Sequence, residues 1–134
     1  MVQMSSITIL IMDDAVIIRK LIVNLLSEIQ GVERIVQATD AASALKLLAE
    51  YKPEVAIYDI KIPGGEGLRN GIDVLKATKK SYPHAAVIML TNHATARYRV
   101  ECQQAGADFF FDKSSEFEQL AAAVEEIMQR TNGA

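Results

Sequence analysis

The chain has 134 residues, half of them hydrophobic, and a formal net charge of −3. This length and composition fit one domain with an ordinary buried core. Acidic and basic residues are scattered without the basic footprint of a nucleic-acid binder, so we expect no direct DNA binding. No apolar run approaches the ~20 residues of a membrane span, and the first residues lack the pattern of a secretory signal.

The chain contains a single cysteine, Cys102, which has no partner for an internal disulfide. A lone thiol agrees with a reducing compartment. Together with the absence of a signal or spanning segment from the sequence, it leads us to expect a cytoplasmic protein.

Buried-type strands alternate with helical patterns along the whole chain. Short apolar, β-branched or aromatic runs predict strands at residues 7–12, 34–39, 55–59, 85–90 and 108–112. Apolar residues at helical spacing predict helices within 13–31, over 41–51, 72–82 and 94–105, and after residue 115. Gly31 is expected just beyond the first helix, Asp40 at the start of the second, and Ser115 with Glu118 as a capping box for the last.

Strict alternation of strand and helix predicts an α/β fold with a parallel sheet covered by helices on both faces. In such sheets the carboxyl ends of all strands lie along one edge. Ligands bind at that edge, beside the point where the strand order reverses.

Polar residues follow the predicted strands at this edge: Asp13 and Asp14, Asp59, Thr91, and Lys113. Each has an ordinary alternative reading when taken alone. Asp14 fits a helix cap, Asp59 a turn, Thr91 a cap and Lys113 a solvated surface residue. His84 and His93 are expected to be exposed loop residues rather than ligands.

The combination of these residues points to phosphoryl chemistry. Three neighbouring carboxylates repel one another unless a cation relieves them. Mg²⁺ binds one or two carboxylates together with waters and phosphate oxygens. An ammonium and a hydroxyl at the same edge suit the remaining phosphoryl oxygens, and one carboxylate would then act as a nucleophile.

The same residues resemble the receiver domain of bacterial response regulators, over roughly residues 6–130. The resemblance rests on "MDD" (12–14), "YDIKIP" (58–63), "MLTN" (89–92) and "FFDKS" (110–114). It implies a flavodoxin-like, doubly wound, five-stranded sheet in the order 2-1-3-4-5. It also implies a phosphoacceptor that assists its own phosphorylation and dephosphorylation and is not otherwise an enzyme.

By this resemblance Asp59 is the phosphoacceptor, and Mg²⁺ is held by Asp13, Asp14, Asp59 and the backbone carbonyl of Lys61. Thr91 and Lys113 follow the phosphoryl group. Phe110 matches the aromatic switch position. The implied partners are a sensor histidine kinase or histidine phosphotransfer protein and a downstream protein target, with a homodimer on phosphorylation as a further expectation.

The chain departs from the family pattern at three places. The pattern P-x-x-x-G-L fits both "PGGEGL" (63–68) and "NGIDVL" (70–75), which indicates an insertion of about four residues within 64–70, in an ambiguous register. Asn92 stands where a small residue is usual, and it could restrict access to the phosphoryl group. Ser114 replaces the usual proline after the lysine.

Two other functions remain open on the residues alone. A haloacid-dehalogenase-type phosphatase uses similar groups, but its nucleophile follows the first strand in a D-x-D pattern. A pseudo-receiver, a binding module that accepts no phosphate, would be favoured by Asn92 and the insertion. We expect no output domain beside the receiver. The signal would then leave through a changed surface made by the fourth helix, fifth strand and fifth helix.

Overall fold

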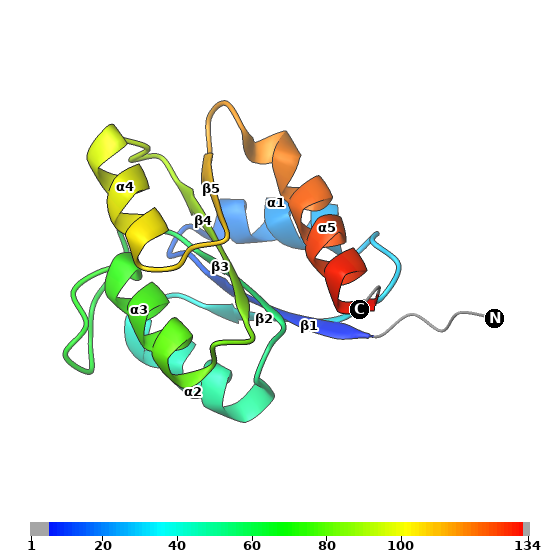
Figure 1. Ribbon diagram of the computed structural model, residues 1–134, viewed down its shortest axis with the longest axis horizontal. Helices are drawn as coiled ribbons and strands as arrows, with labels where there is room; N and C mark the ends of the chain where they lie inside the picture. The colour runs from blue at the N-terminus through cyan, green and yellow to red at the C-terminus, as the bar shows by residue number, and fades with distance from the viewer. Residues whose placement is uncertain (1–5, 133–134) are drawn as a thin grey trace.

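The computed structural model of the protein describes residues 6–132, in which five strands alternate with five α-helices (Figure 1). The strands are β1 (Ile7–Met12), β2 (Val32–Ala38), β3 (Val55–Tyr58), β4 (Ala86–Thr91) and β5 (Phe109–Asp112). The helices are α1 (Val16–Leu26), α2 (Ala41–Tyr51), α3 (Gly71–Ser81), α4 (Ala96–Gln104) and α5 (Leu120–Asn132), with a short 3₁₀ turn, η1 (Phe117–Gln119), before α5.

The five strands form one parallel sheet in the order β2-β1-β3-β4-β5, which confirms the predicted topology. Met12 pairs with Ala38 on one side and with Tyr58 on the other, so β1, β2 and β3 end level with one another. The order reverses beside β1. The residues that follow β1 and β3 therefore meet at the position where doubly wound sheets bind ligands.

Alternate strand residues supply two separate hydrophobic layers, because successive side chains of a strand point to opposite faces. Leu10, Met12 and Tyr58 pack under α2, α3 and α4, whereas Ile9, Ile11 and Ile57 pack under α1 and α5. Figure 1 shows the same division of the helices between the two faces of the sheet. Within residues 6–132, no helix is both long and apolar enough to cross a membrane.

Of the two predicted helix caps, the structure confirms the one at α2 and contradicts the one at α5. Asp40 caps α2 as expected: its side chain accepts a hydrogen bond from the backbone of Ser43 (2.7 Å), and the Ser43 hydroxyl reaches back to the Asp40 backbone N–H. The capping box proposed for Ser115 and Glu118 is wrong. The chain first makes the η1 turn, whose N-cap Glu116 gives no side-chain capping bond, and α5 begins only at Leu120.

The first helix is shorter than expected. It ends at Leu26, and Gly31 is not its C-terminal glycine. Gly31 instead has a positive φ of 99° in the turn that leads into β2, a conformation that glycine adopts without steric cost. The remaining elements agree with the predicted segments to within two residues at each end.

The insertion between β3 and α3 is a small turn closed on itself. Gly65 and Leu68 exchange two backbone hydrogen bonds (3.0 and 2.9 Å), with Glu66 and Gly67 at positive φ between them. Two central residues at positive φ are typical of a type I′ turn. Asn70 then caps α3 by accepting from the backbone of Ile72 and Asp73.

Candidate phosphoryl and metal site

The strand ends bring the predicted site residues to one edge of the sheet. The backbone N–H of Asp59 donates to the Met12 carbonyl (3.0 Å), and the N–H of Lys113 donates to the Thr91 carbonyl (3.0 Å). These bonds continue the parallel ladders one residue beyond the ends of β3 and β5. Asp13, Asp59, Thr91 and Lys113 are therefore anchored by rigid backbone rather than by mobile loop segments.

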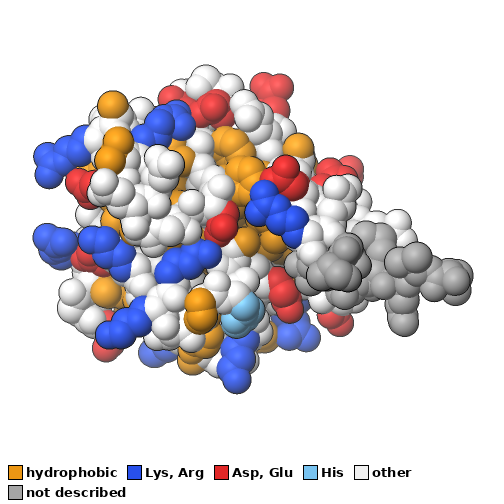
Figure 2. Space-filling model, viewed as in Figure 1, with side chains coloured by type: hydrophobic (Ala, Val, Ile, Leu, Met, Phe, Trp, Pro, Cys, Tyr) orange, Lys and Arg blue, Asp and Glu red, His pale blue; other side chains and the backbone are white. Residues whose placement is uncertain are grey.

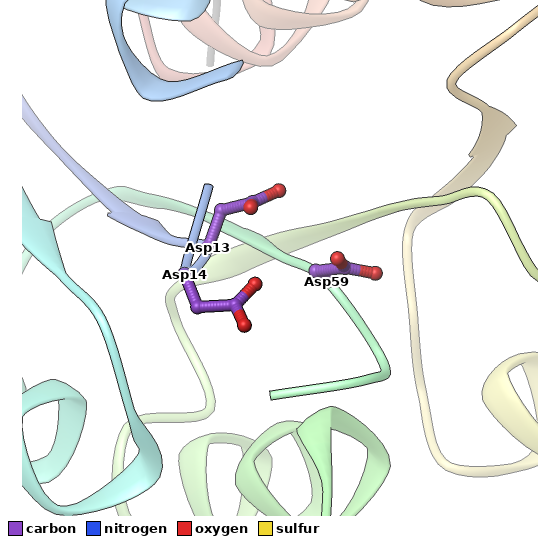
Figure 3. Close-up of side chains that lie close together, drawn as sticks. All are labelled: Asp13, Asp14 and Asp59. Atoms are coloured by element: carbon purple, nitrogen blue, oxygen red, sulfur yellow. The ribbon is translucent and has the colours of Figure 1, made fainter. Parts of the chain in front are cut away.

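Three carboxylates converge at this edge. One carboxylate oxygen from each of Asp13, Asp14 and Asp59 lies within 4.8 Å of the other two. Figure 3 shows Asp13 and Asp14 at the end of β1, with Asp59 at the end of β3 beside them. Asp13 and Asp59 are buried (2% and 7% exposed), while Asp14 is exposed and makes no hydrogen bond or ion pair within residues 6–132.

Lys113 is the cation of this pocket. Its ammonium lies 2.5 Å from an Asp13 oxygen and 2.8 Å from an Asp59 oxygen, and its side chain is only 6% exposed. Burial disfavours the charged ammonium, but the hydrogen bonds and negative charge of Asp13 and Asp59 outweigh burial and raise the pKa of Lys113 above 10.5. One ammonium against three carboxylates leaves an excess of negative charge.

The donor set fits a hard divalent cation. Oxygen ligands from carboxylates, with room for solvent on the exposed Asp14 side, are what Mg²⁺ prefers in proteins. The acidic triad is thus consistent with a divalent metal site. Asp59 also accepts a hydrogen bond from the backbone of Ile60 (2.7 Å), which orients its carboxylate.

The structure rejects several of the ordinary readings. Asp14 does not cap α1, because the N-cap is Ala15 and the Asp14 side chain makes no hydrogen bond within residues 6–132. The side chain of Lys113 is only 6% exposed and ion-paired, rather than solvated. Thr91 is buried and does not cap α4, which is capped by Thr95, although its hydroxyl accepts from the backbone of His93 (3.0 Å). His84 and His93 are exposed, as expected.

The contacts found for two other predicted residues involve groups outside the triad. Lys61 follows Asp59 by two residues, is exposed, and places its ammonium 5.8 Å from the ring centroid of Tyr98 on α4. Phe110 lies on β5 opposite Met89, and its ring is covered by the guanidinium of Arg99 at 4.7 Å. A metal-binding role for the Lys61 carbonyl and a switching role for Phe110 stay predictions.

Sequence reasoning missed two arginines. Arg19 on α1 donates to the backbone carbonyl of Asp13 (2.8 Å), and Arg99 on α4 forms an ion pair with Glu116 (3.3 Å). The one signal in the sequence was that Arg19 lies in the first turn of the helix that follows the acidic pair. Neither contact follows from local pattern, because each guanidinium reaches a different element.

The fold and the acidic pocket define the class of this protein. Residues 9–125 match the family model of the response regulator receiver domain. The chain belongs to this family, and it is the receiver domain of a two-component response regulator with an acidic pocket of Asp13, Asp14, Asp59 and Lys113.

Similar proteins cover almost the whole chain. It is 32% identical to the chemotaxis protein CheY of Pseudomonas aeruginosa over 127 residues, which are 93% of this chain and 98% of that protein. The receiver domain of NtrX from Brucella abortus superposes with a TM-score of 0.77 at 31% identity, covering 90% of this chain and 98% of that one. The response regulator domain of Thermotoga maritima CheB gives a TM-score of 0.76 at 26% identity, covering 96% and 98%.

Other relatives are longer than this chain. The response regulator GacA of Pseudomonas aeruginosa is 28% identical over 121 residues, which are 90% of this chain but 55% of GacA. The chain thus spans about half the length of several curated relatives that it matches.

Proposed function

We propose that this protein accepts a phosphoryl group on Asp59 in a Mg²⁺-dependent reaction, from a sensor histidine kinase or a histidine phosphotransfer protein. One observation carries the proposal: Lys113 bonds both Asp13 and Asp59 in a pocket where three carboxylates meet. Such a pocket has a nucleophile, an ammonium for a phosphoryl oxygen and the ligands for a metal. Family membership independently implies a histidine kinase as the donor.

In the proposed reaction a carboxylate oxygen of Asp59 attacks the phosphorus of a phosphohistidine. The new P–O bond forms as the P–N bond breaks, and the released imidazole nitrogen takes up a proton from solvent. Lys113 moves from the Asp59 carboxylate to an oxygen of the transferred group, a short step for an ammonium already in contact. The Thr91 hydroxyl gives up its bond from the His93 backbone and turns to a second phosphoryl oxygen.

Asp13, Asp14 and Asp59, with the carbonyl of Lys61, would hold the metal. When bound, Mg²⁺ neutralises charge between the carboxylates and the incoming phosphoryl group. Asp14 is free of other partners among the described residues, so it can bind the ion directly or through water. We place this phosphoacceptor domain at residues 6–130.

The proposal is tested with acetyl phosphate and Mg²⁺, followed by intact mass. One phosphoryl adduct is expected on the wild type and none on Asp59→Asn or in excess chelator. Acetyl phosphate delivers the same group, with acetate leaving as the P–O bond breaks. Normal labelling of Asp59→Asn at another residue contradicts the assignment.

The two alternative functions predict other outcomes of the same experiment. A phosphatase would turn over many phosphate esters, but its nucleophile would follow β1, whereas Asp59 follows β3 and the chain matches the receiver family. A pseudo-receiver would give no adduct. Asn92 favours this second alternative, because it is an exposed residue directly after Thr91, where a larger side chain would restrict access to the phosphoryl group.

The output surface in this proposal is the face made by α4, β5 and α5. Helix α4 buries only Cys102, so it is the least anchored helix of the fold. Phe110 lies beside it under Arg99. We propose that phosphorylation changes this face, which then binds a downstream protein or a second copy of the chain.

The surface charges favour a protein partner over DNA. In Figure 2, Lys and Arg side chains gather over α3 and α4. Most of these cations have a carboxylate partner: Arg69 with Asp73, Lys79 with Asp108, Arg97 with Glu101, and Arg99 with Glu116. Near the acidic pocket, Val16, Ile17 and Leu21 of α1 are about half exposed or more, an apolar surface suited to the kinase or phosphotransfer partner.

A further inference from the structure

Asp13 has every polar group of its backbone and side chain engaged. Its N–H donates to the Ala38 carbonyl (3.1 Å), and its side chain accepts from the Ala15 backbone (2.9 Å) and from Lys113. Its carbonyl, beyond the last paired residue of β1, accepts from the Arg19 guanidinium (2.8 Å). A buried carbonyl at a strand end needs such a partner, because leaving it unpaired is costly.

Arg19 is itself held at a second point. Its Nε donates to the side-chain oxygen of Gln37 on the edge strand β2 (3.1 Å). Gln37 pairs in register with Ile11, so the guanidinium is fixed between α1, β1 and β2. A planar guanidinium with two bonded nitrogens has a defined orientation, which a flexible ammonium lacks.

We propose that Arg19 is a positioning residue for the acidic pocket, and that it sets the affinity of the pocket for a divalent metal. This inference rests on the proposed function. The Asp13 carbonyl belongs to the peptide that joins the two residues of the acidic pair, so the bond from Arg19 fixes the backbone from which both carboxylates project toward Asp59. Asp14 has no side-chain partner among residues 6–132, so its direction depends on this backbone alone.

The charge of Arg19 and its positioning bond predict opposite changes in metal affinity when the side chain is removed. A guanidinium near a metal site repels the metal, so removal of the charge alone would tighten metal binding. Loss of the bond to the Asp13 carbonyl would loosen the ligands and weaken binding. The sign of the change therefore distinguishes the two effects.

The test measures the Kd for Mg²⁺ by titration calorimetry on the full chain, without a phosphodonor. Arg19→Ala is expected to weaken binding about 10- to 100-fold, the usual loss when a partner that orients metal ligands is removed. The matched control is Lys20→Ala: Lys20 is the next residue of α1, is exposed, and makes no ion pair within residues 6–132. We expect Lys20→Ala to leave the Kd for Mg²⁺ unchanged or to lower it slightly, because it removes only a positive charge.

Two further variants keep the proposal falsifiable if Arg19→Ala does not fold. Arg19→Lys keeps the charge and one donor for the Asp13 carbonyl, so we expect tighter binding than in Arg19→Ala. Gln37→Ala removes the bond between Gln37 and Arg19 but keeps the bond from Arg19 to the Asp13 carbonyl. We expect it to weaken Mg²⁺ binding as Arg19→Ala does, but by a smaller factor. Wild-type affinity in both Gln37→Ala and Arg19→Ala overturns the proposal, as does tighter binding in Arg19→Ala.

The same titration separates this inference from the proposed function. If the wild type binds no Mg²⁺ and takes up no phosphoryl group, the proposed function fails. If the wild type binds Mg²⁺ and is phosphorylated but Arg19→Ala behaves like Lys20→Ala, the inference about Arg19 fails and the proposed function stands.

Discussion

At the scale of single residues, the acidic pocket depends on one lysine. Asp13 and Asp59 are buried carboxylates from neighbouring strands, and both contact the Lys113 ammonium. Removal of one partner from a buried ion pair leaves an uncompensated charge, which costs far more than the intact pair contributes. In this receiver, Lys113 therefore stabilises the fold while no metal is bound, in addition to its proposed role with the phosphoryl group.

We predict that Lys113→Met lowers the free energy of unfolding by about 3 kcal/mol in chelator, the lower end of the range for a broken buried pair because Asp14 opens the pocket to solvent. The raised pKa of Lys113 determines the pH dependence. The contribution of Lys113 to the free energy of unfolding is complete below its ordinary pKa of 10.5. It is lost as the pH rises through the higher pKa of the folded protein. The difference between wild type and variant, measured by urea denaturation, should shrink above pH 10.5.

Lys80→Met provides the control, because Lys80 is an exposed lysine of α3 with no ion pair in the described part of the chain. Added Mg²⁺ should stabilise Lys113→Met more than wild type, since the ion replaces the missing cation. Equal stability of Lys113→Met and Lys80→Met in chelator would contradict this account of the pocket.

At the scale of elements, α3 starts against the backbone that carries Asp59. The Gly71 N–H donates to the Ile60 carbonyl (2.8 Å), and a Cβ on Gly71 would overlap the carbonyl oxygen of Asp59. This contact resolves the ambiguous register of the loop. Gly71 of "NGIDVL" packs against the backbone that follows β3 and carries Asp59, and Gly65 and Gly67 of "PGGEGL" belong to the insertion.

Gly71→Ala should therefore be more damaging than another glycine substitution nearby. We expect a loss of about 3 kcal/mol or more, because the clash is with backbone that cannot move aside, and slower phosphorylation of Asp59. Gly67→Ala is the comparison: a Cβ there meets nothing within 4 Å, and only the positive φ of 81° opposes it, at about 1 kcal/mol. Thermal unfolding measures the stability of both variants. Equal losses of stability in Gly71→Ala and Gly67→Ala would show that the assigned register of the loop is wrong.

The insertion can be removed by a defined deletion. Gly65 to Leu68 form the closed turn, and a Cβ on Gly64 would lie only 3.6 Å from the Cα of Arg69, so the two flanking residues are already close. Deletion of residues 65–68 joins them and leaves P-G-R-N-G-I, which restores the family spacing. We predict a folded variant within about 1 kcal/mol of wild type, because short loops lose little entropy on closure, with an adduct on Asp59. Failure to fold in urea titrations would refute this.

At the scale of the whole molecule, the sequence predicted the sheet and the site edge because both follow from local patterns. Continuous apolar strands such as residues 7–12 can only be buried on both faces, and strand ends in a parallel sheet share one edge. The errors arose where a side chain had a competing partner. Glu116 accepts from the backbone of Asp112 and pairs with Arg99, so the chain starts η1 there and the Ser115 box does not form.

The face formed by α4 and β5 depends on such long-range contacts. Arg99 covers the ring of Phe110, donates to its carbonyl (3.4 Å) and pairs with Glu116, so one side chain ties α4, β5 and the turn before η1 together. On the other side, the Lys113 N–H is bonded to the Thr91 carbonyl. A shift of Lys113 or Thr91 toward a phosphoryl group would thus displace the same turn that holds Arg99.

We predict that beryllium fluoride, a phosphoryl mimic, raises hydrogen exchange across residues 92–113, because it draws Lys113 and Thr91 inward and loosens the Arg99 contacts. Arg99→Ala should raise exchange in α4 before the mimic is added and reduce the further change on addition. Arg130→Ala is the matched control, since Arg130 also lies over a β5 ring, Phe109 at 5.8 Å, and pairs with Glu126 within α5. It should leave exchange in α4 as in wild type. Exchange differences confined to residues 64–70 would place the output surface at the insertion and refute the assignment to α4 and β5.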